Sequence, residues 1–83
     1  MKVSATGRFN RIAKKLPPNI KTALDLAIRT IMTKPQAGRM KTGDLAGIRV
    51  HKFKVKSQLY LLSYIVDADN GRITLLYFGT HEK

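Results

Sequence analysis

Residues 45–66 read LAGIRVHKFKVKSQLYLLSYIV, a basic segment followed by a polar turn and an apolar segment. Val, Ile, Phe and Tyr favour strands, and they dominate both segments. We therefore expect strands over Ile48–Val55 and Leu59–Val66 that pair as a hairpin around the turn KSQ. The apolar positions of the first strand change parity partway along, which predicts a β-bulge near His51 and Lys52.

A second hairpin follows, closed by Asp69-Asn70-Gly71. Both residues of the Asn-Gly pair accept positive φ, which predicts a tight turn. The turn leads into a strand over Ile73–Phe78 and then into Gly79-Thr80-His81. Because this strand and Leu59–Val66 are apolar at both parities, both are predicted to be central strands buried on two faces.

Two amphipathic helices are predicted before these strands. Thr6 is the expected N-cap of the first, because its hydroxyl can accept an orphan amide of the first turn. Pro17-Pro18 ends the first helix and begins the second, and Lys34-Pro35 ends the second. The apolar stripes are Phe9, Ile12, Ala13 and Leu16 in the first helix and Ile20, Ala23, Leu24, Ala27, Ile28 and Ile31 in the second.

The ends of the helical region complete the predicted order. Lys2 to Ala5 alternates weakly, which indicates a short edge strand, and residues 36–44 form a polar connection that we expect to be a loop. The sum is a single α+β domain over residues 1–83. Its order is β-α-α-β-β-β, with a mostly antiparallel sheet backed by a helical hairpin.

Charge is the strongest compositional signal. Sixteen Lys and Arg face five Asp and Glu in 83 residues, for a formal net charge of +11. Such an excess favours a polyanionic partner: RNA, DNA or an acidic protein segment.

The chain has no cysteine, no signal-peptide pattern and no apolar run that could span a bilayer, so we expect a cytoplasmic protein without a membrane partner. With two histidines and no carboxylate cluster, no metal or cofactor is expected.

Several side chains have the chemistry that RNA cleavage needs. Lys52 and Lys54, two apart on a strand, project to one face and can hold one phosphate. His81 titrates near neutrality and can act as general acid or base. Arg49 and His51 share the opposite parity unless the predicted bulge intervenes. The aromatic rings that could stack on a base are Tyr60, Tyr64 and Tyr77.

The predicted order resembles the RelE/ParE superfamily of bacterial toxin–antitoxin toxins over essentially the whole chain. The Leu45-x-Gly47 step into a basic strand, the strand with Tyr60 and Tyr64, and the ending Gly79-Thr80-His81 add to the likeness. This superfamily includes ribosome-dependent mRNA endonucleases and inhibitors of DNA gyrase. The fold alone therefore leaves the activity open.

The resemblance implies roles for individual residues. Lys52 and Lys54 stand where RelE-type toxins carry two phosphate-handling lysines, and Lys56 stands at another basic position. Gly79-Thr80-His81 looks like the ending of HigB and YafQ types, whose histidine serves catalysis. Leu61, however, occupies the place of a RelE active-site arginine.

The resemblance favours one function and keeps two alternatives. We expect an mRNA endonuclease that uses metal-free attack of the 2′-hydroxyl on the phosphate. Its partners would be mRNA on the ribosome and a cognate acidic antitoxin. The chain ends at Lys83, where relatives usually continue with an aromatic residue and a C-terminal helix. The alternatives are a ParE-type inhibitor of DNA gyrase and an inactive remnant that still binds its antitoxin. The expected catalytic residues are His81, Lys52 and Lys54, and the expected RNA-binding residues are Arg49, His51, Lys56 and Tyr60.

Overall fold

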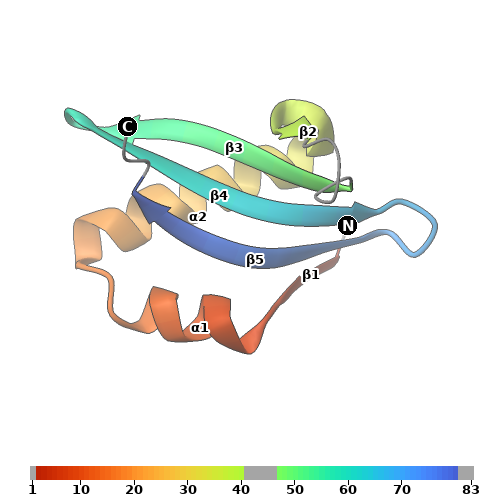
Figure 1. Cartoon of the computed structure of the whole chain (residues 1–83), viewed down its shortest axis with the longest axis horizontal. Coiled ribbons are helices and arrows are strands. Elements are labelled where there is room, and N and C mark those ends of the chain that lie inside the picture. The colour runs from red at the N-terminus through yellow and green to blue at the C-terminus, as the bar shows by residue number, and fades with distance from the viewer. Residues whose placement is uncertain (1, 41–46, 81–83) are drawn as a thin grey trace.

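The computed structural model describes residues 2–40 and 47–80. Within these residues a five-stranded sheet runs in the order β1-β5-β4-β3-β2 (Figure 1). The elements are β1 (Lys2–Ala5), α1 (Gly7–Lys14), α2 (Pro18–Thr33), the short 3-10 helix η1 (Pro35–Ala37), β2 (Arg39–Met40), β3 (Ile48–Val55), β4 (Gln58–Asp67) and β5 (Arg72–Thr80). Strand β1 pairs in parallel with β5, and the other neighbours are antiparallel. The predicted α+β class is confirmed.

Helix α1 begins where the sequence places its cap, fixed to β5. The Phe9 amide donates to Thr6 Oγ1 (3.1 Å). Such a cap typically contributes about 1 kcal/mol to helix stability. The Thr6 hydroxyl also donates to the Leu76 carbonyl (3.3 Å), and the Thr6 amide donates to the Leu75 carbonyl (3.0 Å). Helix α1 therefore starts at the point along β5 where pairing with β1 ends.

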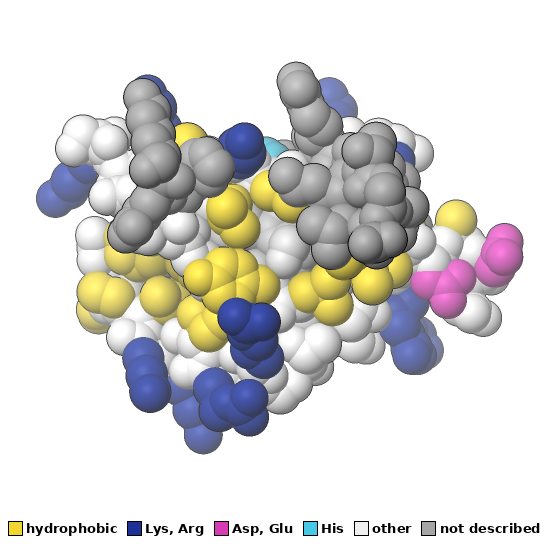
Figure 2. All heavy atoms as spheres, viewed as in Figure 1, with side chains coloured by type: hydrophobic (Ala, Val, Ile, Leu, Met, Phe, Trp, Pro, Cys, Tyr) yellow, Lys and Arg dark blue, Asp and Glu magenta, His cyan; other side chains and the backbone are white. Residues whose placement is uncertain are grey.

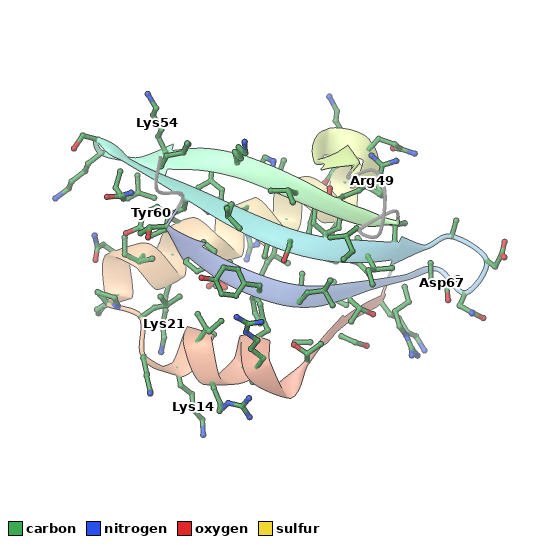
Figure 3. All side chains as sticks on the ribbon, in the orientation of Figure 1. Lys14, Lys21, Arg49, Lys54, Tyr60 and Asp67 are labelled. Atoms are coloured by element: carbon green, nitrogen blue, oxygen red, sulfur yellow. The ribbon has the colours of Figure 1, made fainter. Side chains whose placement is uncertain are left out.

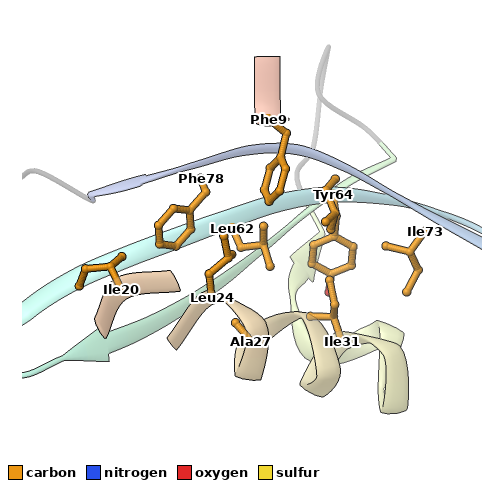
Figure 4. Packing of buried hydrophobic residues seen from close by; sticks show 10 residues of the cluster. Phe9, Ile20, Leu24, Ala27, Ile31, Leu62, Tyr64, Ile73 and Phe78 are labelled. Carbon is orange, nitrogen blue, oxygen red and sulfur yellow. The ribbon is translucent and has the colours of Figure 1, made fainter. Parts of the chain in front are cut away.

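Helix α2 covers the face of the sheet that is turned away in Figure 1. Its apolar stripe packs against inward side chains of β4 and β5, together with Phe9 of α1 (Figure 4). The buried core residues are Phe9, Ile20, Leu24, Ala27, Ile31, Leu62, Tyr64, Ile73, Leu75 and Phe78. Each large apolar side chain contributes about 1.5–3 kcal/mol on full burial, so this cluster anchors the helices to the sheet. Neither helix of the described ranges is long and apolar enough to cross a membrane.

The predicted bulge at His51-Lys52 is wrong. Strand β3 pairs with β4 without interruption over Ile48–Val55. The apolar residues change parity because they lie on different faces at the two ends of the strand: Ile48 and Val50 face one way near its start, and Phe53 and Val55 face the other way near its end. Phe53 and Val55 pack against the core on the helix side, whereas the buried Val50 lies outside the core cluster on the opposite side.

A bulge lies instead between β4 and β5. The register shifts between Ser63 and Tyr64, and Leu76 of β5 is left as an extra residue. This extra residue reverses the parity of the strand, so that Leu75 and Phe78, three positions apart, both reach the core. The apolar residues at both parities of β5 are thus partly the result of a bulge.

The expectation that β4 and β5 are buried on two faces is also wrong. Both are interior strands, but one face of the sheet is not covered by the helices, and Ile65 there is 38% exposed. We call this surface the open face; it is turned toward the viewer in Figures 1 and 2. Strand alternation and pairing assign to it, from β3, β4 and β5, Ile48, Val50, Lys52, Lys54, Leu59, Leu61, Ser63, Ile65, Asp67, Arg72, Thr74, Tyr77 and Gly79.

Three connections differ from the expectations. The β3–β4 turn is Lys56-Ser57, one residue shorter than predicted. The β4–β5 loop spans residues 68–71, and of its Asn-Gly pair only Gly71 has positive φ (61°). The predicted loop over residues 36–44 includes the end of η1 and strand β2, which pairs with β3. Residues 41–44 of that segment lie outside the described residues.

Candidate functional site

Lys52 and Lys54 project from β3 onto the open face, as strand alternation predicts. Both side chains are exposed, and their cross-strand partners in β4 are Leu61 and Leu59. Figure 3 shows Lys54 extending outward from β3. The two ammonium groups are therefore accessible to a polyanion such as an RNA backbone.

The open face combines apolar side chains with cations around them. Figure 2 shows hydrophobic side chains gathered over the sheet and Lys and Arg side chains at its margins. The described acids lie away from the lysines: Asp25 is on α2, whereas Asp67, at the last position of β4 on the open face, and Asp69 in the β4–β5 loop are at the end of β4 opposite Lys52 and Lys54. Among the described residues, no carboxylate stands beside Lys52 and Lys54, so a phosphate would meet no competing anion there.

Arg49 lies on the helix side and holds the segment before β2. Its Nη1 donates to the Gly38 carbonyl (2.9 Å). The Gly38 amide donates to Tyr64 Oη (2.8 Å), and the Tyr64 hydroxyl donates to the Pro35 carbonyl (2.8 Å). Burial raises the pKa of Tyr64, which keeps this phenol a proton donor. These contacts fix the chain from Pro35 to Gly38 against the sheet.

His51 also faces the helices. Its ring stacks on Phe53 with centroids 5.6 Å apart. The groove around it is lined by Ala23, Leu26, Ala27, Thr30, Phe53 and Lys54. Burial lowers the pKa of His51, which favours the neutral imidazole. The structure thus places Arg49 and His51 on the side of the sheet opposite the open face.

Tyr60 and Lys56 occupy contrasting positions. The Tyr60 ring is nearly parallel to that of Phe78, with centroids 5.3 Å apart, and packs against the core. Lys56 is exposed in the β3–β4 turn with φ 57°, a conformation that is unfavourable for a residue with a side chain. Lys56 is therefore accessible near Lys54, whereas the Tyr60 ring is used in packing.

Comparison with known proteins identifies the family. The model of the ParE-like toxins of type II bacterial toxin–antitoxin systems matches residues 3–83. The chain belongs to this family. Among curated proteins, none matches the toxin at a significant level.

Solved structures show the same fold. A chain of the RelBE2 toxin–antitoxin complex from Mycobacterium tuberculosis is 24% identical with a TM-score of 0.82, and the match covers 96% of each chain. A chain of the intact RelBE toxin–antitoxin complex from E. coli is 18% identical with a TM-score of 0.78, covering 99% of this toxin and 98% of that chain. The isolated E. coli RelE toxin also has a TM-score of 0.78 at 18% identity, with 99% and 85% covered.

The toxin's predicted catalytic histidine, His81, lies outside the described residues. The last described residue, Thr80, pairs with Tyr60 at the end of β5. One position earlier, Gly79 pairs with Leu61, which in turn pairs with Lys52. Leu61 is therefore the direct neighbour of Lys52 on the open face.

The sequence singled out Tyr60 among three tyrosines, yet the one on the open face is Tyr77, opposite Ser63. Because β5, the strand that carries Tyr77, is apolar at both parities, its pattern does not show the Leu76 bulge that determines this placement. No group of three or more His, Cys, Asp or Glu that could hold a metal occurs in the described part of the toxin.

Proposed function

We propose that this toxin is a ribosome-dependent mRNA endonuclease that cleaves message by attack of a 2′-hydroxyl on the adjacent phosphate. The observation that carries the proposal is the pair Lys52 and Lys54, exposed together on the open face with no described carboxylate beside them. A paired cationic site of this kind binds phosphate and stabilises the charge that develops on it during the reaction.

The chemistry needs a base, an acid and charge stabilisation. The 2′-oxygen forms a bond to phosphorus as its proton passes to the base, and the bond to the 5′-oxygen breaks as that oxygen takes a proton from the acid. The products are a 2′,3′-cyclic phosphate and a 5′-hydroxyl. We assign the acid or base role to His81, and charge stabilisation to Lys52 and Lys54, either of which could also serve as the base. The mechanism uses no metal or cofactor.

The proposed RNA contacts follow from exposure. Lys56 extends the cationic site from the β3–β4 turn. Arg49, His51 and Tyr60 support the site from the helix side, since Arg49 holds Gly38 and Tyr60 packs on the core. Substitution of these three residues would therefore weaken RNA binding indirectly, because it would shift the strand that carries Lys52 and Lys54.

The proposed protein partner is an acidic antitoxin, partly disordered when free. The formal charge of +11 and the membership in a type II toxin–antitoxin family support this partner. Two of the similar structures are toxin–antitoxin complexes. An acidic segment that covers the cationic site would also prevent access of RNA to it.

Primer extension on a message translated in a reconstituted system tests the proposal. Addition of the purified toxin should produce new termini within codons that a ribosome occupies, and no termini in the same message without ribosomes. A message that stays intact in this system, from a toxin that arrests growth when it is expressed in cells, would contradict the nuclease activity.

A second candidate function is binding of DNA gyrase without chemistry by the toxin. The ParE-like family model and the apolar Leu61 beside Lys52 favour it, because the resemblance to RelE-type toxins implies an active-site arginine at the position that Leu61 occupies. Inhibition of gyrase supercoiling by the purified toxin, together with intact message in the translation reaction, would establish this function in place of the nuclease.

A further inference from the structure

One aromatic ring on the open face has no role in the proposed reaction. Tyr64 is buried and Tyr60 packs against the core. Tyr77 lies outside the core cluster, opposite Ser63, because the extra residue Leu76 turns it to the open face. Tyr77 is half-buried as a whole residue, so part of it remains accessible to solvent.

Gly79 allows the Tyr77 ring to lie along the strand. A Cβ atom at Gly79 would come within 2.8 Å of Tyr77 Cζ and 2.9 Å of Cε2, closer than such atoms approach. The phenol ring therefore lies over the backbone of the residue two positions further along β5. Any larger residue at position 79 would displace the ring.

Arg8 reaches the same ring from α1. Its Cζ lies 4.8 Å from the centroid of the Tyr77 ring, within the range of a cation–π contact. Thr6, which caps α1 and donates to the Leu76 carbonyl, fixes the start of the helix beside this part of β5. The guanidinium therefore lies over the ring at the margin of the open face.

The core does not require this arrangement. The Tyr64 hydroxyl takes part in two hydrogen bonds, whereas that of Tyr77 makes none among the described residues. The ring of Tyr77 also adds nothing to the core cluster. A half-buried tyrosine with a guanidinium over its ring is instead a pair on which an unpaired base can stack, because bases stack on aromatic rings and on guanidinium planes.

We propose that Tyr77 and Arg8 form a stacking platform for one nucleobase of single-stranded RNA, a site that rests on the proposed function. Gly79, beneath the ring, is two strands away from Lys52 through Leu61. At about 4.8 Å per strand this separation is roughly 10 Å. A nucleotide whose phosphate contacts the lysines can therefore place a neighbouring base on the platform.

Fluorescence of a modified message tests the platform. Ribosomes carry a message with 2-aminopurine in the A-site codon, and 2′-O-methyl groups prevent cleavage. The parent toxin should quench the fluorescence as the base stacks. Tyr77→Ala should lose the quenching and bind about 5- to 150-fold more weakly, the usual cost of a lost stacking contact. Tyr77→Phe keeps the ring and should behave as the parent.

Arg8→Gln and Arg11→Gln form a matched pair, because both remove one positive charge from α1. Only Arg8 contacts the ring, so only Arg8→Gln should reduce quenching and affinity. This pair also decides the question if Tyr77→Ala fails to fold. Equal effects of the two arginine variants would overturn the platform.

Two outcomes separate the platform from the function on which it rests. A parent toxin that cleaves unmodified message, with unchanged quenching in Tyr77→Ala, would overturn the platform and leave the nuclease in place. A parent that neither cleaves nor quenches would overturn both.

Discussion

Single residues of β3 divide between two tasks according to their parity. Lys52 and Lys54 stand on the open face, where nothing described neutralises them, whereas Arg49 and His51 point to the helices. One strand therefore supplies both the proposed phosphate site and its support. Substitutions at alternate positions should separate activity from stability.

The lysine pair gives the first prediction. Lys52→Ala combined with Lys54→Ala should abolish growth inhibition, because each charge-assisted phosphate contact is worth roughly 1.5–3 kcal/mol. The melting temperature should change little, because both side chains are exposed. Growth curves at equal expression measure the effect.

The control variant replaces Lys14 and Lys21, which are exposed on the helices (Figure 3), with alanine and should stay toxic. Equal toxicity of both double variants would make the site assignment wrong.

His51 gives a prediction about pH. Burial lowers its pKa in the folded state from the ordinary 6.5. As the pH falls through 6.5 the unfolded chain binds a proton that the folded chain does not yet bind, so stability present above 6.5 is lost below it. Urea unfolding at about pH 7.5 and pH 5 should show a larger loss for the parent than for His51→Gln. Identical losses would show that His51 is as solvated in the folded state as in the unfolded chain.

At the scale of elements, two irregular features shape the site. The bulge at Leu76 places Tyr77 on the open face, and the contacts of Tyr64 and Arg49 with Gly38 fix the chain that enters β2. The bulge lies in β5, and the contacts to Gly38 come from Tyr64 of β4 and Arg49 of β3, so both features belong to the interior strands. The open face therefore depends on contacts made on the opposite side of the sheet.

The Tyr64 contacts can be tested by removal of one oxygen. Tyr64→Phe leaves the Gly38 amide and the Pro35 carbonyl without their partner, at a cost of about 1–3 kcal/mol for buried groups. Tyr77→Phe removes an oxygen that makes no hydrogen bond in the described structure, and should cost close to nothing. Urea unfolding of the two variants measures the difference. Equal stability would mean that water replaces the Tyr64 contacts at no cost.

Elements with strong periodicity could be predicted from the sequence. The Thr6 cap and the bounds of β3 are confirmed, because each rests on a local pattern of side chains. The helix stripes are confirmed except for Leu16, which follows the end of α1 at Lys14, and Ala23, which lies outside the core cluster. Strand β2 could not be predicted, since its two residues, Arg39 and Met40, carry no alternation and depend on pairing with β3. The two-residue turn at Lys56 lacks the glycine that usually marks positive φ.

The candidate site could be predicted only in part, because local patterns fix the parity of a strand but not its irregularities. Parity alone places Lys52 and Lys54 together and Arg49 and His51 opposite them. The choice between Tyr60 and Tyr77 could not be made, because an apolar strand shows no sign of a one-residue bulge. His81 lies outside the described residues, so its role stays a prediction.

The whole molecule is a small, strongly cationic domain with one sheet face not covered by its helices. The formal charge of +11 favours polyanions at long range, and the apolar side chains of the open face give a partner something to bury. RNA and an acidic antitoxin would therefore compete for one surface. Salt should weaken both interactions.

Binding of an antitoxin should raise the melting temperature. A partner at about 100 times its Kd adds about 2.7 kcal/mol of stability, which corresponds to roughly 10–20 °C for a domain of this size. Thermal melts of the toxin with and without its cognate acidic antitoxin, at low and high salt, measure the shift. An unchanged melting temperature at saturating partner would count against the acidic antitoxin.

The proposed chemistry requires the 2′-hydroxyl next to the cut, so one modified message examines it. The cut is first mapped by primer extension, and the nucleotide on its 5′ side is then replaced by its 2′-deoxy form. We predict that the toxin leaves this message intact at the replaced position, while it cuts the unmodified message to a 2′,3′-cyclic phosphate. Cleavage of the deoxy message at the original position and rate would contradict the mechanism.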